Sequence, residues 1–300
     1  MLAPEFEVIE PAFRRLILAH VGLRQLFGDG AWTEGPVYVP AGRYLLFSDL
    51  PNDRILRWDE TNGVISVFRS PCGFANGNTL DHLGRVVTCL HQARSIVRTD
   101  HDGVTRTLCS THASRRLNSP NDVIVKSDGS IWFTDPTYGI DTDYEGDIAT
   151  PEQPGRYVYR LDDGQTEPVP VATDFSQPNG LAFSPDESHL YVVDSGFSSD
   201  PELPRHIRRF SLHPDLTLSG GEVLATCDVG IFDGLRVDIA GNLWVAAGDG
   251  VRCYDCSGML IGRIYVPEAA SNLCFGGLKR NRLFITATRS VYTVPLNVRG

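Results

Sequence analysis

Short runs of apolar, β-branched and aromatic residues recur along the chain, and residues typical of turns separate them. Two clear examples are IWFTD at 131–135 and HLYVVD at 189–194. Apolar runs of this length, bounded by Gly, Asn, Asp and Ser, are typical of buried β-strands. The repeats lack the longer segments with a 3.6-residue period that an array of helices would need. The pattern therefore predicts an all-β protein.

One segment occurs six times, and each copy begins with an acidic or amide residue. The copies are EGPVYVPAGRYLLFSD, NGNTLDHLGRVVTC, NDVIVKSDGSIWFTD, NGLAFSPDESHLYVVD, DGLRVDIAGNLWVAA and NLCFGGLKRNRLFIT. Their first residues, called the column residues below, are Glu34, Asn76, Asn121, Asn179, Asp233 and Asn272. The spacing runs from 39 residues, between the last two, to 58 residues, between the third and the fourth. Several short strands in a period of this length are typical of a β-propeller with one four-stranded blade per repeat.

The strands of one blade are clearest in the fourth repeat. Four segments there are expected to be strands: 180–184, 189–194, 206–212 and 222–227. Asn-Gly and Asp-Gly pairs, such as the one at 128–129, mark hairpin turns elsewhere because these residues accept a positive φ.

The sixth repeat contains only three such segments, at 273–276, 282–286 and 290–295. We expect residues 23–27 to supply its fourth strand, because this closure leaves no open sheet edge in that blade. The predicted fold is a six-bladed β-propeller of four-stranded antiparallel blades, with the last blade closed by an N-terminal strand. Residues 21–300 should form this single domain, and residues 1–20 should form an N-terminal segment with helical tendency after Pro11.

Composition and charge exclude several classes of partner. The chain is 42% hydrophobic and 21% charged, which is ordinary for a globular protein. Its net charge of −10, with the acidic residues scattered through turns, argues against nucleic acid and anionic membranes. No stretch approaches the ~18 consecutive apolar residues of a membrane-spanning helix, and the first residues lack the apolar region of a secretory signal. A cytoplasmic protein is expected, and its oligomeric state stays open.

Neither the cysteines nor the common catalytic motifs indicate a catalytic or metal site. Seven cysteines in a chain without an export signal are expected to be free, buried thiols. Cys253 and Cys256 form a CxxC pair, but no second pair follows at zinc-site spacing, so we interpret them as residues of a strand and its turn. HExxH, Walker and GxSxG motifs are absent.

The column residues carry the candidate chemistry. The first strand of every blade lines the central channel of a propeller, so residues at one repeat position should converge around the axis. We expect four of them to be metal ligands: Glu34, Asn121, Asn179 and Asp233. Two carboxylates and two amide oxygens suit a hard divalent cation, with Ca²⁺ preferred and Mg²⁺, Mn²⁺ or Zn²⁺ as alternatives. Without the cation the carboxylates should repel, and at least one should have a raised pKa.

A structural interpretation of the column competes with this one. Asn and Asp also begin turns and cap strands, which would explain any single column residue. Six such residues in register, with Glu34 at a position where turn chemistry does not call for glutamate, favour the metal site.

Two long connections, 136–155 and 195–205, both follow the second strand of a blade and should therefore lie on one face of the ring. Long loops on a rigid scaffold usually shape a binding site. The candidate substrate-binding residues are Asn76 of the column, His91 and Asp135 at the ends of second strands, and Tyr138 of the first loop. For His91, a hydrogen-bonding role in a strand-end turn is an equal alternative.

Four of the repeat segments, extended as EGPVYVPAGRYLLFSD, SPNDVIVKSDGSIWFTDPTYG, QPNGLAFSPDESHLYVVD and DGLRVDIAGNLWVA, resemble the gluconolactonase/SMP-30/regucalcin family of six-bladed propellers. The similarity covers most of the chain, and FTDPTYG is similar to the bacterial gluconolactonase branch. The resemblance implies one divalent metal at the channel mouth and hydrolysis of sugar lactones. It places Glu34, Asn179 and Asp233 as ligands and Asn121 as a ligand or a substrate contact. The animal branch has a substrate-binding arginine where this chain has Ser119, and Arg116 or His91 are the candidates to replace it.

The mechanism that the resemblance implies is attack of water on a lactone carbonyl that the metal polarises, with Asp233 as general base. Two alternatives remain at this point. A metal-dependent organophosphate or aryl-ester hydrolase would use the same site, and a non-catalytic calcium-binding propeller would bind metal without turnover. In a purely structural propeller the column would cap strands only.

Overall fold

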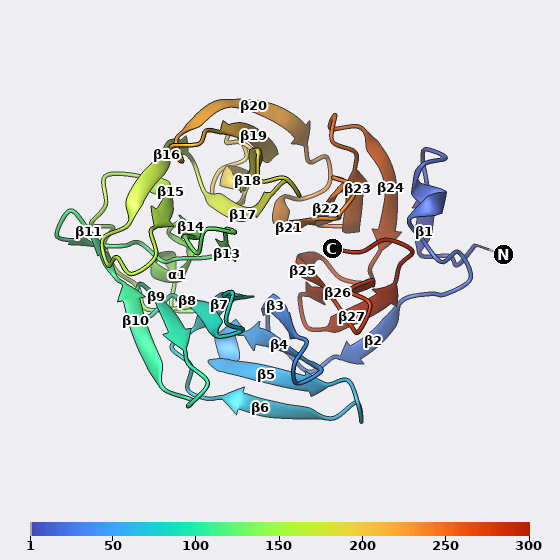
Figure 1. The fold of residues 1–300 in the computed structure, drawn as a ribbon, viewed down its shortest axis with the longest axis horizontal. Coiled ribbons are helices and arrows are strands. Elements are labelled where there is room, and N and C mark those ends of the chain that lie inside the picture. The colour runs from blue at the N-terminus through green and yellow to red at the C-terminus, as the bar shows by residue number, and fades with distance from the viewer. Residues whose placement is uncertain (1) are drawn as a thin grey trace.

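The computed structural model describes residues 2–300, which form six β-sheets arranged as a ring around a central axis (Figure 1). Five of the sheets have four strands, and one has five. Successive strands of each blade pair antiparallel with their neighbours. The predicted six-bladed β-propeller is therefore confirmed.

The strands of each blade run from the axis outward. Blade 1 contains β3 (Thr33–Val39), β4 (Tyr44–Asp49), β5 (Arg54–Asp59) and β6 (Ile65–Arg69). Blade 2 contains β7 (Ala75–Leu80), β8 (Val86–Leu90), β9 (Ser95–Thr99) and β10 (Thr105–Cys109). Blade 3 contains β13 (Val123–Val125), β14 (Ile131–Asp135), β15 (Arg156–Leu161) and β16 (Val169–Phe175).

The second half of the ring repeats this order. Blade 4 contains β17 (Pro178–Phe183), β18 (His189–Asp194), β19 (His206–Leu212) and β20 (Leu218–Thr226). Blade 5 contains β21 (Phe232–Val237), β22 (Leu243–Ala247), β23 (Gly250–Tyr254) and β24 (Leu260–Tyr265). Blade 6 contains β25 (Ala270–Gly276), β26 (Arg282–Ala287) and β27 (Val291–Pro295).

The expected closure of blade 6 is present. Its fourth strand is β2 (Arg24–Phe27), which pairs antiparallel with β27. The two ends of the propeller are thus joined by backbone hydrogen bonds within one sheet, and the outer edge of β27 is paired.

The N-terminal segment differs from the expected helix. It contains a single 3₁₀ turn at Phe13–Arg15, and β1 (Phe6–Val8) adds a fifth strand to blade 5 by pairing with β24. The Phe6 and Phe13 side chains are buried in the cluster between blades 5 and 6, while Ile17 forms a bridge to Leu296. These separate anchor points hold the segment extended, and this tertiary burial outweighs a weak helical propensity.

Few elements lie outside the blades. The two-stranded ribbon β11 (Thr111–His112) and β12 (Arg115–Arg116) follows blade 2, and α1 (Tyr138–Asp141) follows β14. Two further 3₁₀ turns span Leu50–Asn52 and Gly196–Ser198. Across residues 2–300, every helix is too short or too polar to cross a bilayer.

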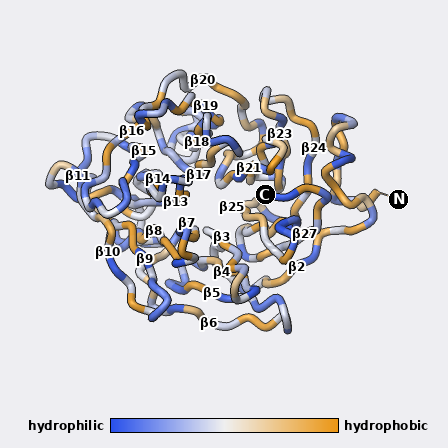
Figure 2. The backbone as a smooth tube through the Cα atoms, viewed as in Figure 1, coloured by the Kyte–Doolittle hydropathy of each residue, from blue (hydrophilic) through white to orange (hydrophobic). Residues whose placement is uncertain are grey.

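The hydrophobic core lies between adjacent blades rather than in one central mass. The buried apolar residues form six clusters, and Figure 2 shows hydrophobic residues distributed around the whole ring. Strand β18 shows why. Leu190 and Val192 pack against blade 3, while Tyr191 and Val193 pack against blade 5. Both faces of a middle strand are buried, so its sequence is a continuous apolar run.

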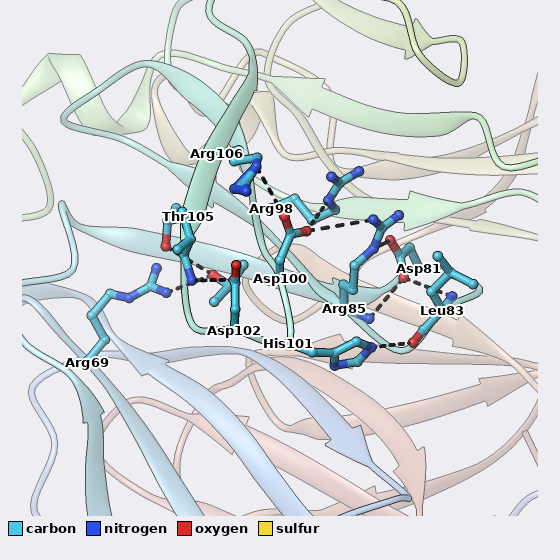
Figure 3. Close-up of polar contacts among 12 residues, drawn as sticks. Arg69, Asp81, Leu83, Arg85, Arg98, Asp100, His101, Asp102, Thr105 and Arg106 are labelled. Atoms are coloured by element: carbon cyan, nitrogen blue, oxygen red, sulfur yellow. Dashed lines mark hydrogen bonds and ion pairs between the residues drawn. The ribbon is translucent and has the colours of Figure 1, made fainter.

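An ion-pair network occupies the outer part of blade 2 (Figure 3). Asp100 accepts a 2.7 Å hydrogen bond from Arg98, and its carboxylate lies 3.3 Å from Arg106 and 3.7 Å from Arg85. These arginines hold the pKa of Asp100 below its usual range. The network lies at the end of the blade where β7 turns into β8, which is opposite to the end that carries Asn76. It therefore fixes strand ends and takes no part in the column.

The innermost strands approach one another closely at the column. The backbone N–H of Gly77 donates a 2.8 Å hydrogen bond to the carbonyl oxygen of Asn121 in the next blade. A Cβ atom on Gly77 would lie 2.5 Å from that oxygen, and one on Gly35 would lie 2.0 Å from the carbonyl oxygen of Asn76. These glycines are needed for space, because a backbone neighbour cannot rotate away as a side chain can.

We therefore expect Gly77→Ala to lower the free energy of unfolding by roughly 1–3 kcal/mol, as overpacking does in well-packed interiors. Gly28→Ala is the matched control, because its Cβ would meet only the flexible amide end of Gln25. The control should cost less than ~1 kcal/mol. Urea unfolding followed by circular dichroism measures both. Equal stability of Gly77→Ala and the control would contradict this account of the inner ring.

Candidate active site

Each column residue lies where its innermost strand departs from regular pairing. The registers shift between Glu34 and Val37, Ala75 and Asn78, Pro178 and Leu181, Phe232 and Leu235, and Ala270 and Asn272. In blade 3 the column residue Asn121 lies two residues before β13, which begins at Val123. Such irregularities redirect a side chain away from the ladder. Here they release the column side chains toward the axis.

Five of the six column residues line one cavity of about 120 Å³ at the mouth of the channel. Its lining consists of Trp32, Glu34, Asn76, Asn121, Tyr138, Glu145, Asn179, Ile231 and Asp233. The sixth column residue, Asn272, lies behind Glu34 and donates a 3.2 Å hydrogen bond from its side-chain nitrogen to Glu34 Oε2. The predicted convergence of the column is present in the structure.

The two column carboxylates line the same cavity, with Glu34 buried and Asp233 half-buried. Burial raises the pKa of Glu34 to about 8, although the Gly35 N–H donates a 2.8 Å hydrogen bond to Glu34 Oε2 and opposes the shift. Burial also raises the pKa of Asp233 well above its usual value, and the charge of Glu34 adds to the effect. The raised pKa expected for two facing carboxylates is thus found.

A third inner-ring carboxylate is neutralised by a base. Asp122 is buried next to Asn121, and its Oδ2 lies 3.1 Å from Nη1 of Arg236 in β21, across the channel. Beyond this ion pair, the other half of the channel opens into a cavity of about 320 Å³ that Arg236 and Arg280 help to line. The ion pair therefore separates the two ends, and Glu34 and Asp233 face the mouth.

The orientation of the Asn179 amide follows from its partners. The Ser195 hydroxyl group donates a 2.6 Å hydrogen bond to the carbonyl oxygen of Phe232, so towards Asn179 it can only accept. It accepts from Asn179 Nδ2 at 3.2 Å. The amide nitrogen is thus engaged, and the amide oxygen is the atom that remains for a ligand in the cavity.

This donor set fits a hard cation. Within residues 2–300, no three His, Cys, Asp or Glu side chains are grouped as a metal site, so carboxylates alone do not complete one. The cavity offers the carboxylates of Glu34 and Asp233, the oriented amide oxygen of Asn179, and the amide of Asn121. Two buried negative charges with oxygen neighbours suit Ca²⁺, Mg²⁺ or Mn²⁺ better than a thiolate-preferring ion.

The structure brings two of the four predicted substrate residues to the cavity. Asn76 and Tyr138 line it, and His91 is fully buried behind Asn76, with a 3.3 Å contact between His91 Nε2 and Asn76 Nδ2. Asp135 is not among the lining residues. Its carboxylate accepts a 2.8 Å hydrogen bond from the Asn118 N–H, because the end of β14 turns it toward the backbone of the preceding loop. Burial raises the pKa of Asp135 to about 7.

The structure also shows the surroundings of Ser119, which stands where the animal branch of the family has a substrate-binding arginine. Ser119 is buried and donates a 2.7 Å hydrogen bond to the carbonyl oxygen of Pro136, so it holds the loop after β14. Arg116 is exposed in β12 and does not line the cavity, because its backbone is tied to Glu152 in the same loop. Arg116 is therefore not a replacement for that arginine.

Sequence reasoning missed three lining residues. Trp32 and Ile231 each precede a column residue by two positions and lie just before β3 and β21. The other repeats have residues of mixed type at this position (Phe74, Ser119, Gln177 and Ala270), so the repeats did not mark it. Glu145 lies within the loop 136–155 that the sequence marked as a binding loop, but nothing local distinguishes it from the other acidic residues there. The contact of Tyr138 with Ser198 at 3.1 Å confirms that the two long loops share one face.

Comparisons with known proteins agree with this architecture. Residues 32–289 match the protein family described as SMP-30/Gluconolactonase/LRE-like region. A gluconolactonase from Zymomonas mobilis is 33% identical over 91% of this chain and 80% of its own length. A pentonolactonase from Haloferax volcanii is 28% identical over 84% of this chain and 80% of its own length.

Solved structures of other proteins also share this fold. A gluconolactonase from Xanthomonas campestris superimposes with a TM-score of 0.90 at 37% identity, covering 98% of this chain and 96% of that chain. The calcium-binding protein regucalcin from Agrobacterium tumefaciens has a TM-score of 0.77 at 20% identity and covers 93% and 95% of the two chains. The second similarity concerns the fold alone.

The raised pKa of Glu34 predicts how stability depends on pH in EDTA. Unfolded Glu34 loses its proton near pH 4.5 and folded Glu34 near pH 8, so unfolding releases a proton between these values. The free energy of unfolding should therefore fall by about 1–2 kcal/mol from pH 6.5 to 8. Glu34→Gln should show a smaller fall over this range. Urea unfolding at several pH values measures both, and parallel curves for the two proteins would contradict the assignment.

Proposed function

This chain belongs to the SMP-30/gluconolactonase/LRE-like family and is a lactonase, and we propose that it opens a sugar lactone at the channel mouth with one bound divalent cation. The observation that carries this proposal is the pair of buried carboxylates, Glu34 and Asp233, facing one small cavity together with oriented amides. Relatives that share about a third of their residues with this chain are gluconolactonases, which supports the sugar lactone as substrate.

The proposed cation is held by Glu34, Asn179 and Asp233, with Asn121 as a fourth ligand or a substrate contact. When bound, it supplies charge that polarises a carbonyl oxygen and stabilises the oxyanion formed there. The site suits a cation for an electrostatic reason. Two carboxylates that retain protons when buried together are expected to ionise beside a divalent charge, and Ca²⁺ is the preferred candidate for such an oxygen donor set.

Asp233 is the proposed general base. Water attacks the lactone carbonyl carbon and transfers a proton to the Asp233 carboxylate. The ring C–O bond then breaks as Asp233 returns this proton to the leaving ring oxygen, which gives the hydroxy acid and restores the carboxylate. Asn179 lowers the pKa of Asp233 and so opposes part of the increase that burial causes. Asp233 lines the cavity together with Glu34 and Asn179, where a proton acceptor is needed.

The walls of the cavity suit a polyhydroxylated ring. Glu145, Asn76 and Tyr138 offer polar atoms, while Trp32 and Ile231 offer apolar surface. Burial raises the pKa of Glu145 to about 7, so near neutral pH it is able to donate or accept a hydrogen bond from a sugar hydroxyl group. The small volume favours one ring over a longer saccharide.

The first test measures hydrolysis of glucono-δ-lactone, with and without EDTA. We expect activity that EDTA abolishes and that Ca²⁺, Mg²⁺ or Mn²⁺ restores, because two uncompensated carboxylates cannot polarise a carbonyl. Paraoxon and phenyl acetate, assayed in parallel, test the organophosphate or aryl-ester alternative. Faster turnover of either than of the lactone would replace the proposed substrate class, and metal binding without any turnover would indicate a binding protein.

The second test is Asp233→Asn. The variant keeps the shape of the side chain but cannot accept the proton, so kcat should fall by roughly 10²–10⁴-fold. Its circular dichroism spectrum should match that of the wild type. Asp122→Asn serves as an acidic control from the inner ring outside the cavity lining. Full activity of Asp233→Asn would remove this residue from the mechanism.

A further inference from the structure

His91 is a buried histidine that touches the cavity only through another residue. It follows β8, its exposed fraction is 0%, and it is not among the lining residues. Burial lowers the pKa of His91 to about 4, so its ring is neutral near pH 7. A neutral imidazole has one N–H donor and one nitrogen acceptor, and its neighbours decide which is which.

The partner of Nδ1 decides the tautomer. His91 Nδ1 lies 2.9 Å from the backbone carbonyl oxygen of Glu145. A carbonyl oxygen can only accept, so Nδ1 carries the proton and donates it. Nε2 is then the unprotonated nitrogen and can only accept. The loop 136–155 therefore sets the tautomer of a residue in blade 2.

The tautomer in turn decides the orientation of Asn76. Because Nε2 accepts, Asn76 must present its nitrogen, and Nδ2 lies 3.3 Å from Nε2. The amide oxygen Oδ1 is left buried without a hydrogen-bond partner among residues 2–300, although Asn76 is only 2% exposed and lines the cavity. A buried acceptor without a donor costs free energy, typically 1–3 kcal/mol, unless a ligand supplies one.

We propose that His91 is a positioning residue that holds the Asn76 amide with its oxygen toward the cavity, where it accepts a hydrogen bond from a hydroxyl group of the substrate. The inference rests on the proposed lactonase function for the identity of the ligand. It separates the roles of two residues that the sequence had grouped together: Asn76 contacts the substrate, and His91 orders Asn76. The preferred ligands are lactones whose ring carries hydroxyl groups.

The surroundings leave His91 no room to change this arrangement. A Cβ atom on Gly139 would lie 2.4 Å from His91 Cγ, so the backbone of α1 packs against the ring. The Gly139 N–H donates a 3.0 Å hydrogen bond to Ser119 Oγ, which anchors that backbone. The loop 136–155 thus fixes both the position and the tautomer of the His91 ring. Through this ring it also fixes the orientation of the Asn76 amide.

The tautomer is tested directly on the wild-type protein labelled with ¹⁵N-histidine. Long-range ¹H–¹⁵N correlation spectra distinguish a ring protonated at Nδ1 from one protonated at Nε2, and the signals absent from His91→Gln identify His91. We expect the neutral Nδ1–H form from pH 5.5 to 8. An Nε2–H form or an imidazolium at pH 7 would overturn the proposal, because Asn76 would then present its oxygen to His91. This measurement needs no substrate.

Steady-state kinetics test whether the loss of His91 weakens binding of the substrate. His91→Phe removes the acceptor for Asn76 Nδ2, so KM for glucono-δ-lactone should rise about 5- to 100-fold, with a smaller change in kcat. The preference for glucono-δ-lactone over δ-valerolactone, which has no hydroxyl group, should fall by a similar factor. His91→Gln provides an amide oxygen as acceptor and should stay within ~5-fold of the wild-type KM.

A double mutant separates positioning from a general packing role. If His91 acts through Asn76, adding His91→Phe to Asn76→Ala should leave KM unchanged relative to Asn76→Ala. Additive losses would overturn the proposal. His101→Phe is the matched control, because its Nε2 also lies near a backbone carbonyl oxygen, that of Leu83 at 2.8 Å, but outside the cavity (Figure 3). A wild-type protein without activity on either lactone would refute the proposed function while the tautomer result still stood.

Discussion

The structure depends on holding two carboxylates, the buried Glu34 and the half-buried Asp233, in one cavity at the axis of a closed ring. Two such groups repel when ionised and lose hydration when buried, which is why the pKa values of both are raised. A flexible chain would separate them. The propeller prevents this because blades 1 and 5 are fixed by cores on both sides, and strand β2 closes the ring. The scaffold therefore keeps the two carboxylates together, and in the absence of a compensating charge they retain protons near neutral pH.

A second principle governs the amides around these carboxylates. An asparagine side chain can present either its nitrogen or its oxygen to a ligand, and nothing in the residue itself selects one. In this protein a neighbour with a fixed hydrogen-bonding role makes the selection. Ser195 accepts from Asn179 because its own proton goes to Phe232, and His91 accepts from Asn76 because its own proton goes to Glu145. The amide oxygen of Asn179 is thereby left for a ligand, and that of Asn76 has no hydrogen-bond partner among residues 2–300. Residues outside the cavity lining thus determine which atom of a lining amide is engaged and which remains for a ligand.

The fold was largely predictable from local pattern. Six copies of one segment predicted six blades, and the apolar runs predicted strands such as β18 and β19 with their observed limits. Closure by residues near the N-terminus followed from counting the strands of the sixth repeat. The N-terminal segment has only one 3₁₀ turn after Pro11, and β1 was not predicted, because Phe6 and Phe13 are buried by contacts with blades that lie more than two hundred residues away in sequence. Local propensity carries no information about such contacts.

The sequence by itself determined which residues meet at the axis, because repeat register in a ring places equivalent positions at equivalent heights. It also indicated the chemical class of the site, since oxygen is the only lone-pair donor to a cation that acids and amides in that register offer. Tertiary structure alone decided that Asp135 turns away to Asn118, that Glu145 reaches the cavity from a loop, and which neighbours engage the amide nitrogens of Asn76 and Asn179. These outcomes depend on hydrogen bonds between segments distant in sequence. A donor and an acceptor that meet only after folding leave no pattern along the chain.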